Sequence, residues 1–162
     1  MQYTAIGQFL FLLVVANGAP IIARDLLKAH GNSPIDGGRT WYDGRPLLGP
    51  AKTVRGLLAA GIATGGAAPL VGRPLLLGVL LGLCAMGGDL LSSCLKRRLG
   101  ITSSESALGL DQSLEALGPA LALRTSFAFQ AADVVTAVLA FFVVAIGLSR
   151  VLYRLHIRDR PV

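Results

Sequence analysis

One segment of the chain, GGDLLSSCLKRR at residues 87–98, carries five polar side chains at helical spacing. They stand at i, i+3, i+4, i+7 and i+8 and are Asp89, Ser92, Ser93, Lys96 and Arg97. An α-helix would place all five on one face. This order suits a metal–phosphate site, because Mg²⁺ takes one or two carboxylates and completes its shell with phosphate oxygens and water. The alternative is that Asp89 pairs with Ser93 or Lys96 only to hold helices together.

A second group of acids follows in the sequence LDQSLE. Asp111 and Glu115 stand four positions apart, so they face the same way on a helix. Acids from two neighbouring helices, together with Lys96 and Arg97, are the groups that phosphoryl or nucleotidyl transfer uses, since that chemistry depends on positioning and charge stabilisation. The pattern makes Asp89, Lys96 and Asp111 the candidate catalytic residues. Asp111 could alternatively cap the N-terminus of a helix.

The loop at residues 24–55 is long, rich in glycine and basic. Loops of this length without secondary structure of their own are uncommon and are usually functional. A glycine turn followed by Lys52, Thr53 and Arg55 at a helix start could hold a phosphate group, because free backbone N–H groups and the helix dipole both favour an anion. The spacing is not that of a Walker A loop. The alternative is a positively charged loop that only sets membrane orientation.

Three further polar residues lie within apolar segments. Asn17 precedes Pro20 in a stretch that reads ANGAP, and it either reaches the candidate site or bonds a neighbouring helix. Gln130 and Asp133 lie in the outer half of the last apolar segment, far from that site. We expect Asp133 to pair with Arg73, Arg124 or a buried polar group. No Ser-His-Asp, HExxH or CxxC arrangement is present, so hydrolase and zinc chemistry have little support.

The composition indicates a membrane protein. Of the 162 residues, 53% are hydrophobic and only 15% are charged, and the mean hydropathy is +0.64. A soluble domain carries roughly 25% charged residues. The formal net charge of +6 could indicate a nucleic-acid binder, but this hydropathy favours basic loops held against an anionic membrane surface. We therefore expect a bilayer and no nucleic acid as the surroundings of this chain.

Four segments are candidate membrane spans by their run of apolar residues: 6–23, 56–71, 75–95 and 127–148. Lys and Arg gather in the loop 24–55, after the third segment and after the last, and such regions favour the cytoplasm. Because the third and last segments both end inside, one more crossing must lie between them, and the only candidate is 108–123.

This pattern predicts a single all-α integral membrane domain over residues 1–162, with about five transmembrane helices. Its N-terminus would lie outside, its C-terminus in the cytoplasm, and its cytoplasmic loops at 24–55 and 96–107. The expected location is the cell membrane, with the candidate site facing the cytoplasm. Two GxxxG pairs, one in each of the second and third segments, predict close helix packing. They are Gly61 with Gly65 and Gly78 with Gly82.

The assembled motifs resemble those of the CDP-archaeol synthase family, relatives of the CDP-diacylglycerol synthases. The matching pieces follow in order over nearly the whole chain: ANGAP at 16–20, PIDGG at 34–38, DGR at 43–45, KTVRG at 52–56, GDLLSSCLKRRLG at 88–100 and LDQ at 110–112. The long run followed by LDQ is specific, whereas the short glycine pieces are not. Val54 departs from the family pattern, in which many members carry a tryptophan.

The resemblance implies an enzyme that moves CMP from CTP to a lipid phosphate, either archaetidic or phosphatidic acid, and gives a CDP-lipid and pyrophosphate. It implies Mg²⁺ as the cofactor, held by Asp89 and Asp111. It also implies contacts between the nucleotide phosphates and a polar set of residues. These are Lys52, Thr53, Arg55, Ser93, Lys96, Arg97 and Asn17.

Two other functions have less support in the sequence. A CDP-alcohol phosphotransferase would need a DG–AR signature with later aspartates at fixed spacing, and Asp43-Gly44-Arg45 does not extend into it. A small transporter or anion-binding membrane protein could use the same basic cytoplasmic vestibule, but it would need polar residues through the whole membrane depth. The sequence leaves open whether the lipid tails are acyl esters or isoprenoid ethers.

Overall fold

The structure is a computed structural model, and it describes residues 1–28, 30–101 and 109–154. Residues 102–107 of the expected cytoplasmic loop, Leu108 at the start of the fourth expected span, and Arg158 and Arg160 of the basic tail lie outside the described residues. Within them the chain is helical, apart from turns and two isolated bridges in the loop after the first helix. The all-α architecture expected from the sequence is confirmed.

The described residues form five α-helices, with one short 3₁₀ helix, η1, between the second and third. Their bounds are α1 Tyr3–Leu27, α2 Val54–Ala67, η1 Ala68–Val71, α3 Leu75–Arg98, α4 Leu110–Ala122 and α5 Ala131–Arg154. In the part of the chain that the structure describes, four stretches are long and apolar enough to cross a bilayer: α1, α2 with η1, α3, and residues 131–148 of α5. Helices are the expected form for such runs, since the hydrocarbon core offers no water to bond backbone groups.

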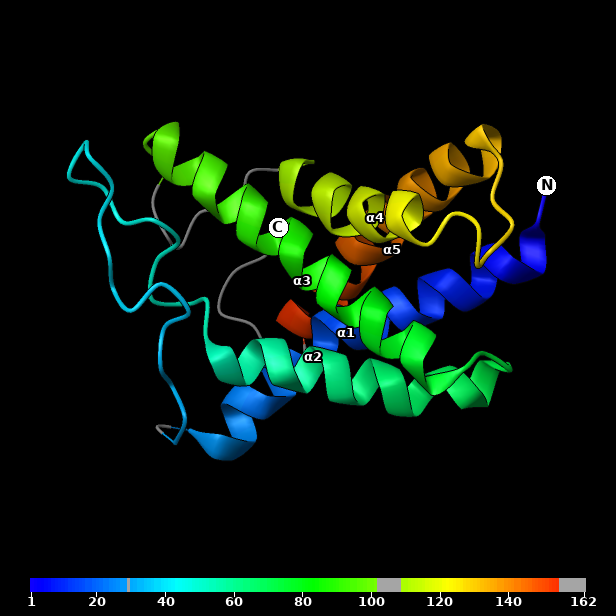
Figure 1. Cartoon of the computed structure of the whole chain (residues 1–162), viewed down its shortest axis with the longest axis horizontal. Helices are drawn as coiled ribbons and strands as arrows, with labels where there is room; N and C mark the ends of the chain where they lie inside the picture. Colours follow the sequence, from blue (N-terminus) through cyan, green and yellow to red (C-terminus); the bar gives the residue numbers. More distant parts are fainter. Residues whose placement is uncertain (29, 102–108, 155–162) are drawn as a thin grey trace.

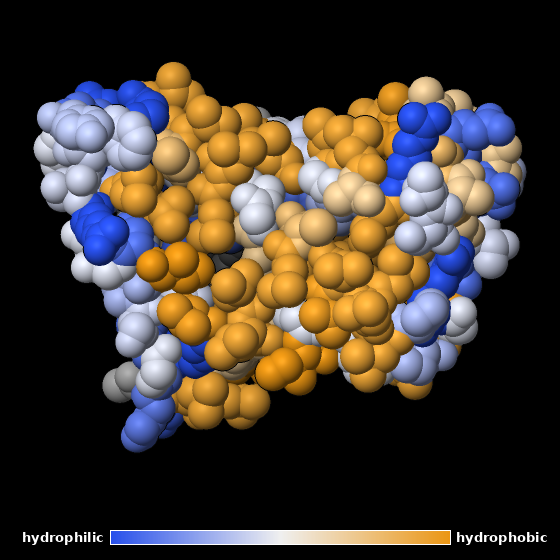
Figure 2. All heavy atoms as spheres, viewed as in Figure 1, coloured by the Kyte–Doolittle hydropathy of each residue, from blue (hydrophilic) through white to orange (hydrophobic). Residues whose placement is uncertain are grey.

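The long axis of the molecule runs between two polar ends (Figure 1). One end holds the loop 28–53 and the C-terminal end of α3, and the other holds the N-terminus and the connections from α2 to α3 and from α4 to α5. Apolar side chains form a broad belt between these ends (Figure 2). Many large apolar residues in the belt are exposed, as Ile62 and Val143 are, which is the surface expected of a protein that faces lipid.

The fourth helix is shorter than the sequence predicts. α4 has 13 residues and a length of roughly 20 Å, against a hydrocarbon core of about 30 Å. It lies beside α3 and runs back toward the end that holds the N-terminus (Figure 1). The crossing expected of residues 108–123 stays a prediction, and the direction of α4 agrees with it.

The core forms around α1, whose Phe9, Leu12 and Leu13 are fully buried. Phe9 packs edge-on against Phe127 and Phe129, with ring centroids 5.4 Å apart in both pairs. These two phenylalanines lie in the turns before α5, which begins at Ala131, and therefore belong to the core rather than to a span that starts at 127. The turns bring them inward, so the last helix starts four residues later than predicted.

Small residues set the distance between α2 and α3, as the GxxxG pairs predict. A Cβ atom added to Gly78 would lie 2.3 Å from the backbone oxygen of Thr64, and one added to Gly82 would lie 2.8 Å from that of Ala60. A Cβ on Gly65 would lie 2.6 Å from the side chain of Val79. At Gly78 and Gly82 the two backbones are thus too close for a larger residue, and at Gly65 the side chain of Val79 fills the space.

Candidate active site

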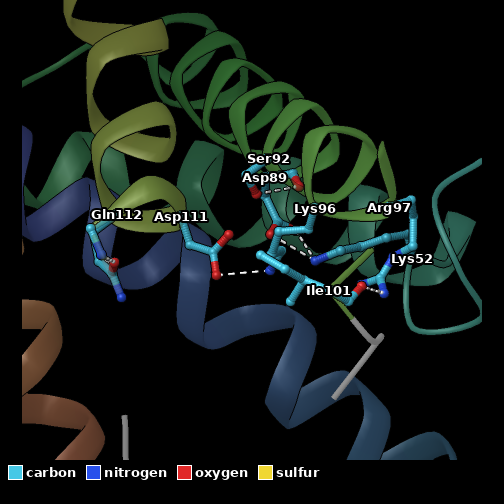
Figure 3. Close-up of polar contacts among 9 residues, drawn as sticks. Lys52, Asp89, Ser92, Lys96, Arg97, Ile101, Asp111 and Gln112 are labelled. Atoms are coloured by element: carbon cyan, nitrogen blue, oxygen red, sulfur yellow. Dashed lines mark hydrogen bonds and ion pairs between the residues drawn. The ribbon is translucent and has the colours of Figure 1, made fainter. Parts of the chain in front are cut away.

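Two lysine–aspartate pairs link α3 to the loop 28–53 and to α4 (Figure 3). Lys52 Nζ donates to both carboxylate oxygens of Asp89, each at 2.6 Å. Lys96 Nζ donates to Oδ2 of Asp111 at 2.8 Å. The side chains of Lys96 and Asp111 are 9% and 15% exposed, and those of Lys52 and Asp89 are 22% and 19% exposed. Such burial makes an unpaired charge costly, which explains why every charge in these pairs has a partner.

α3 supplies the central polar face of this site. Ser92, Ser93, Lys96 and Arg97 are all buried, on the face that their spacing predicts. Ser92 Oγ donates to the backbone oxygen of Asp89 at 2.9 Å. The guanidinium of Arg97 donates to the backbone oxygen of Ile101, and its Nε has no partner among the described residues. Arg97 is therefore a buried cation with unused donor capacity beside the two pairs.

α4 brings Asp111 to this face by a close contact with α3. A Cβ added to Gly88 would lie 2.2 Å from the backbone oxygen of Leu114, so no side chain fits between the two helices at that point. The helix begins after Gly109, whose N–H donates to Oε1 of Gln112 at 3.0 Å. Asp111 stands in the first turn of the helix rather than at its cap, so the capping alternative for Asp111 is wrong.

The loop before α2 places Lys52. The N–H of Ile35 donates to the oxygen of Lys52 at 2.8 Å, and the N–H of Val54 donates to the oxygen of Ser33 at 3.1 Å. These bonds pair residues 33–35 with 52–54 in an antiparallel manner at the base of the loop. Thr53 is the N-cap of α2, and its Oγ1 accepts from the N–H of Gly56 at 3.2 Å. The loop is thus ordered by its own backbone pairing.

Asp36 fastens the middle of the same loop. Its Oδ2 accepts from the N–H groups of Leu48 and Gly49 at 2.9 and 3.3 Å, and its Oδ1 accepts from the N–H of Gly38 at 2.9 Å. Burial acts to raise the pKa of the Asp36 carboxyl, but these backbone donors outweigh it and hold the pKa below the ordinary value. The carboxylate form therefore stabilises the loop.

Two predicted phosphate-binding residues make their contacts elsewhere. Arg55 donates to the backbone oxygens of Lys28 and His30 at 2.8 and 2.6 Å, and so ties the start of α2 to the end of α1. Asn17 donates to the oxygen of Leu13 at 3.0 Å, within its own helix. Neither side chain has a hydrogen bond to the lysine–aspartate pairs among the described residues.

The expected partners of Asp133 were partly wrong. Its carboxylate is buried and accepts from the backbone N–H groups of Gln2 and Gln130, at 2.9 and 3.0 Å. Arg73 instead donates to Gln8 and Ser126, and Arg124 donates to the backbone oxygen of Phe129. The first N–H groups of a helix lack partners in the helix itself, and Asp133 supplies an acceptor at the start of α5.

Glu115 shares a helix face with Asp111 by its spacing, but the sequence alone assigns it no role in the site. It is half-buried on α4 and lies within electrostatic reach of Asp89, Asp111 and both lysines. Three carboxylates and two lysines thus share one small region. The spacing of four positions between Asp111 and Glu115 is the feature of the sequence from which the position of Glu115 in the site could be predicted.

The carboxylates fit a hard divalent cation that is shared with a phosphate. Among the described residues no three His, Cys, Asp or Glu side chains gather as a ready-made metal cage. Oδ1 of Asp111 is buried and has no hydrogen-bond partner in that part of the chain, so its lone pairs could accept a bond from a ligand. Mg²⁺ needs only one or two carboxylates when phosphate oxygens and water complete its shell, and Asp111 with Asp89 meets that need.

Fold and site together define a polytopic helical membrane protein with two lysine–aspartate pairs next to its long basic loop. A model of the CarS-like family, described as CDP-archaeol synthase, matches residues 70–162. A CDP-archaeol synthase of Sulfurisphaera tokodaii is 35% identical over an alignment of 170 positions. This alignment covers 98% of the present chain and 97% of that protein. The chain belongs to the CDP-archaeol synthase family.

Other similarities agree with this family. A CDP-archaeol synthase of Hyperthermus butylicus is 46% identical over 106 residues, and this match spans 61% of the present chain and 60% of the relative. A solved structure, described as an intramembrane enzyme for archaeal membrane lipid biosynthesis, superimposes with a TM-score of 0.74 at 31% identity. That superposition covers 87% of this chain and 90% of the other.

Proposed function

We propose that this protein transfers CMP from CTP to a lipid phosphate and releases a CDP-lipid and pyrophosphate. The family relationship supports this reaction, and the observation that carries it is the buried cluster of Lys52–Asp89 and Lys96–Asp111 at one end of the apolar belt. An oxygen of the lipid phosphate bonds to the α-phosphorus of CTP. The bond from that phosphorus to the oxygen bridging to the β-phosphate breaks, and its electron pair leaves with pyrophosphate. The attacking oxygen is already anionic, so it needs no general base.

Asp89 and Asp111 would hold Mg²⁺. A bound divalent ion would neutralise developing charge on the phosphates and orient them for in-line displacement. The two aspartates come from adjacent helices whose spacing Gly88 fixes, so their separation is set by the fold. The unpartnered oxygen of Asp111 supports this assignment.

The cations of the site would bind the triphosphate. Lys52 and Lys96 now neutralise the aspartates, and they would turn to phosphate oxygens once the carboxylates take a metal ion. Arg97, which is buried and whose Nε has no partner among the described residues, would stabilise the pyrophosphate leaving group. Ser93 lies on α3 with Lys96, and Thr53 directly follows Lys52 at the start of α2. We propose that the hydroxyl groups of both residues contact the nucleotide phosphates. Asn17 and Arg55 stay weaker proposals, because their present bonds lie elsewhere.

The lipid substrate would be archaetidic acid rather than phosphatidic acid. The relatives are named CDP-archaeol synthases, and that name supports a lipid with ether-linked isoprenoid tails. The tails would lie against exposed apolar side chains of the belt, and the lipid phosphate would reach the lysine–aspartate pairs at its edge (Figures 2 and 3). CTP would enter from water at the end that holds the loop 28–53.

The site would face the cytoplasm of the cell membrane, with the N-terminus outside. This orientation follows from the basic residues of the loop and can be tested with single cysteines in a chain whose Cys84 and Cys94 are replaced by alanine. In intact cells, a membrane-impermeant maleimide should label Ser126→Cys and spare Ser33→Cys until the membrane is opened. The reverse pattern would show the opposite orientation.

The reaction is tested with purified protein in detergent, labelled CTP, Mg²⁺ and either archaetidic or phosphatidic acid. We expect Mg²⁺-dependent CDP-lipid from the wild type, with archaetidic acid preferred. Asp89→Asn should lose at least about 100-fold in rate, the size typical of losing a charge-stabilising group. Asp25→Asn, which removes the same charge from an exposed surface pair, is the control and should leave the rate unchanged. A folded wild type that binds CTP but forms no CDP-lipid would indicate the transporter or anion-binding alternative.

A further inference from the structure

The tip of the loop 28–53 is a small hairpin. The N–H of Leu47 donates to the oxygen of Arg39 at 2.9 Å, and the N–H of Trp41 donates to the oxygen of Arg45 at 2.8 Å. Oδ1 of Asp43 accepts from the N–H of Arg45 at 3.1 Å and so fixes the turn. The DGR sequence at 43–45, to which the proposed reaction gives no role, is this turn.

Arg45 reaches from the hairpin to the end of α3. Its Nη1 donates to the backbone oxygens of Arg97 and Arg98, at 3.2 and 2.9 Å. The last carbonyl groups of a helix have no partner within the helix, and the helix dipole favours a positive charge beside them. The guanidinium also lies against Gly100, where an added Cβ would stand 3.4 Å from Nη1 and where φ is +78°. Arg45 therefore caps α3 from another segment of the chain.

Arg98 makes the reciprocal contacts from α3 to the hairpin. Its Nη1 donates to Oδ1 of Asp43 and its Nη2 to the backbone oxygen of Pro46, both at 2.7 Å. Its guanidinium carbon lies 5.5 Å from the ring centroid of Trp41. A lone exposed ion pair contributes little, but here two arginines interlock and bind carbonyl groups as well as a carboxylate. We call Asp43, Arg45 and Arg98 the latch.

The latch connects two of the elements that carry the site, α3 and the loop 28–53. α3 bears Asp89, Lys96 and Arg97, and the loop bears Lys52. The base of the loop is held by its pairing at residues 33–35 and 52–54, while within the described residues its tip is attached to α3 through the latch. Without the latch, the tip would keep its own hairpin but lose its attachment to the helix that holds the rest of the site.

We propose that Asp43, Arg45 and Arg98 are positioning residues that hold the loop against α3, so that the cations of both elements meet one triphosphate. The proposal rests on the proposed cytidylyl transfer for its kinetic consequence. Its structural part, attachment of the hairpin to α3, can be tested whether or not the protein turns over CTP. The latch residues touch neither substrate nor metal in this scheme and act through the loop.

Kinetics provide the first test. Arg45→Ala should raise the KM for CTP about tenfold, the effect of losing hydrogen bonds from one charged group, with kcat changed less than about threefold. Arg39→Ala removes the same charge from the same loop, where Arg39 is exposed, and should leave both constants unchanged. Equal effects of the two substitutions, or a loss confined to kcat, would overturn the proposal.

A charge exchange provides the second test. Asp43→Arg and Arg98→Asp should each raise KM for CTP, and the double variant should recover a large part of the loss, because the ion pair is restored with reversed sign. A double variant no better than the worse single variant would contradict the latch.

Amide hydrogen exchange provides the third test and needs no activity. In Arg45→Ala the peptides covering 39–47 and the end of α3 should exchange faster than in the wild type, while Arg39→Ala should match the wild type. If the wild type makes no CDP-lipid, the proposed function fails and this exchange result still decides the latch. Unchanged exchange in Arg45→Ala would show that the hairpin is not held by α3.

Discussion

Lys52 Nζ lies 2.6 Å from both carboxylate oxygens of Asp89, although the two residues are 37 positions apart in the chain. A divalent cation bound by Asp89 would need those same oxygens. In the proposed reaction the lysine and the metal ion would therefore compete for one carboxylate, and nucleotide binding would relieve the competition by giving Lys52 phosphate oxygens instead. Metal and CTP should bind with positive coupling.

Lys52→Met should strengthen metal binding in the absence of nucleotide. Removing the competing ammonium should raise Mn²⁺ affinity about tenfold, while CTP affinity falls by a similar factor because one phosphate contact is lost. Electron paramagnetic resonance of Mn²⁺ measures the first effect and equilibrium binding of labelled CTP the second. Lys28→Met, which removes an exposed lysine, is the control. Mn²⁺ binding that is weaker than in the wild type would show that Lys52 and metal do not share Asp89.

Lys96→Met should destabilise the protein through Asp111. The carboxylate would be left buried without its partner, at a cost of about 3–5 kcal/mol for a broken buried pair. The double variant Lys96→Met/Asp111→Leu removes both charges and should recover most of that stability but none of the activity. Stability is measured by monitoring unfolding in detergent with circular dichroism, and activity is measured by the formation of CDP-lipid. Recovered activity in the double variant would exclude both residues from the reaction.

Gly88→Ala should separate α3 from α4. The new Cβ would meet the backbone oxygen of Leu114 at 2.2 Å, and overpacking of this kind costs about 1–3 kcal/mol. Asp111 would move away from Asp89, so activity should fall more than stability does. Gly87→Ala is a matched control, since a Cβ there meets nothing within 4 Å. Equal activity in the two variants would show that this helix contact does not position the site.

The loop should loosen at acid pH through Asp36. A carboxyl whose pKa is lowered by folding stabilises the folded loop above its ordinary pKa of 3.8, and this contribution is lost as the pH falls through the lowered value. Fluorescence of Trp41, the one tryptophan of the chain, should report a transition centred below pH 3.8. Asp36→Asn should show the loosened signal already at pH 7, and Asp25→Asn should behave like the wild type. A transition centred above the ordinary pKa would contradict a lowered pKa for Asp36 in the folded loop.

The exposed Asp43 titrates in the same direction. Burial acts to raise its pKa, but the N–H of Arg45 and the charge of Arg98 outweigh it and lower the pKa. Asp43→Asn in the same fluorescence titration separates the two carboxyls: it should loosen the tip at pH 7 while leaving the part of the transition that belongs to Asp36.

The sequence alone determined that this chain forms membrane helices and which residue types could do chemistry. Hydropathy is a property of local segments, because each apolar run must satisfy its own backbone within lipid, so the spans can be read without knowing their neighbours. Helical periodicity likewise placed Ser92, Ser93, Lys96 and Arg97 on one face, since side chains three and four positions apart are neighbours on any α-helix. The resemblance to one family rested on the same local motifs.

Only the tertiary structure decided which charges meet. Lys52 pairs with Asp89 and Lys96 with Asp111 because the loop folds back on itself and because Gly88 lets α4 approach α3. The same holds for the latch, in which Arg98 and Asp43 lie 55 positions apart. Contacts between distant segments depend on backbone approach and on carbonyl groups left unpaired at helix ends, and neither is visible in the type or spacing of residues.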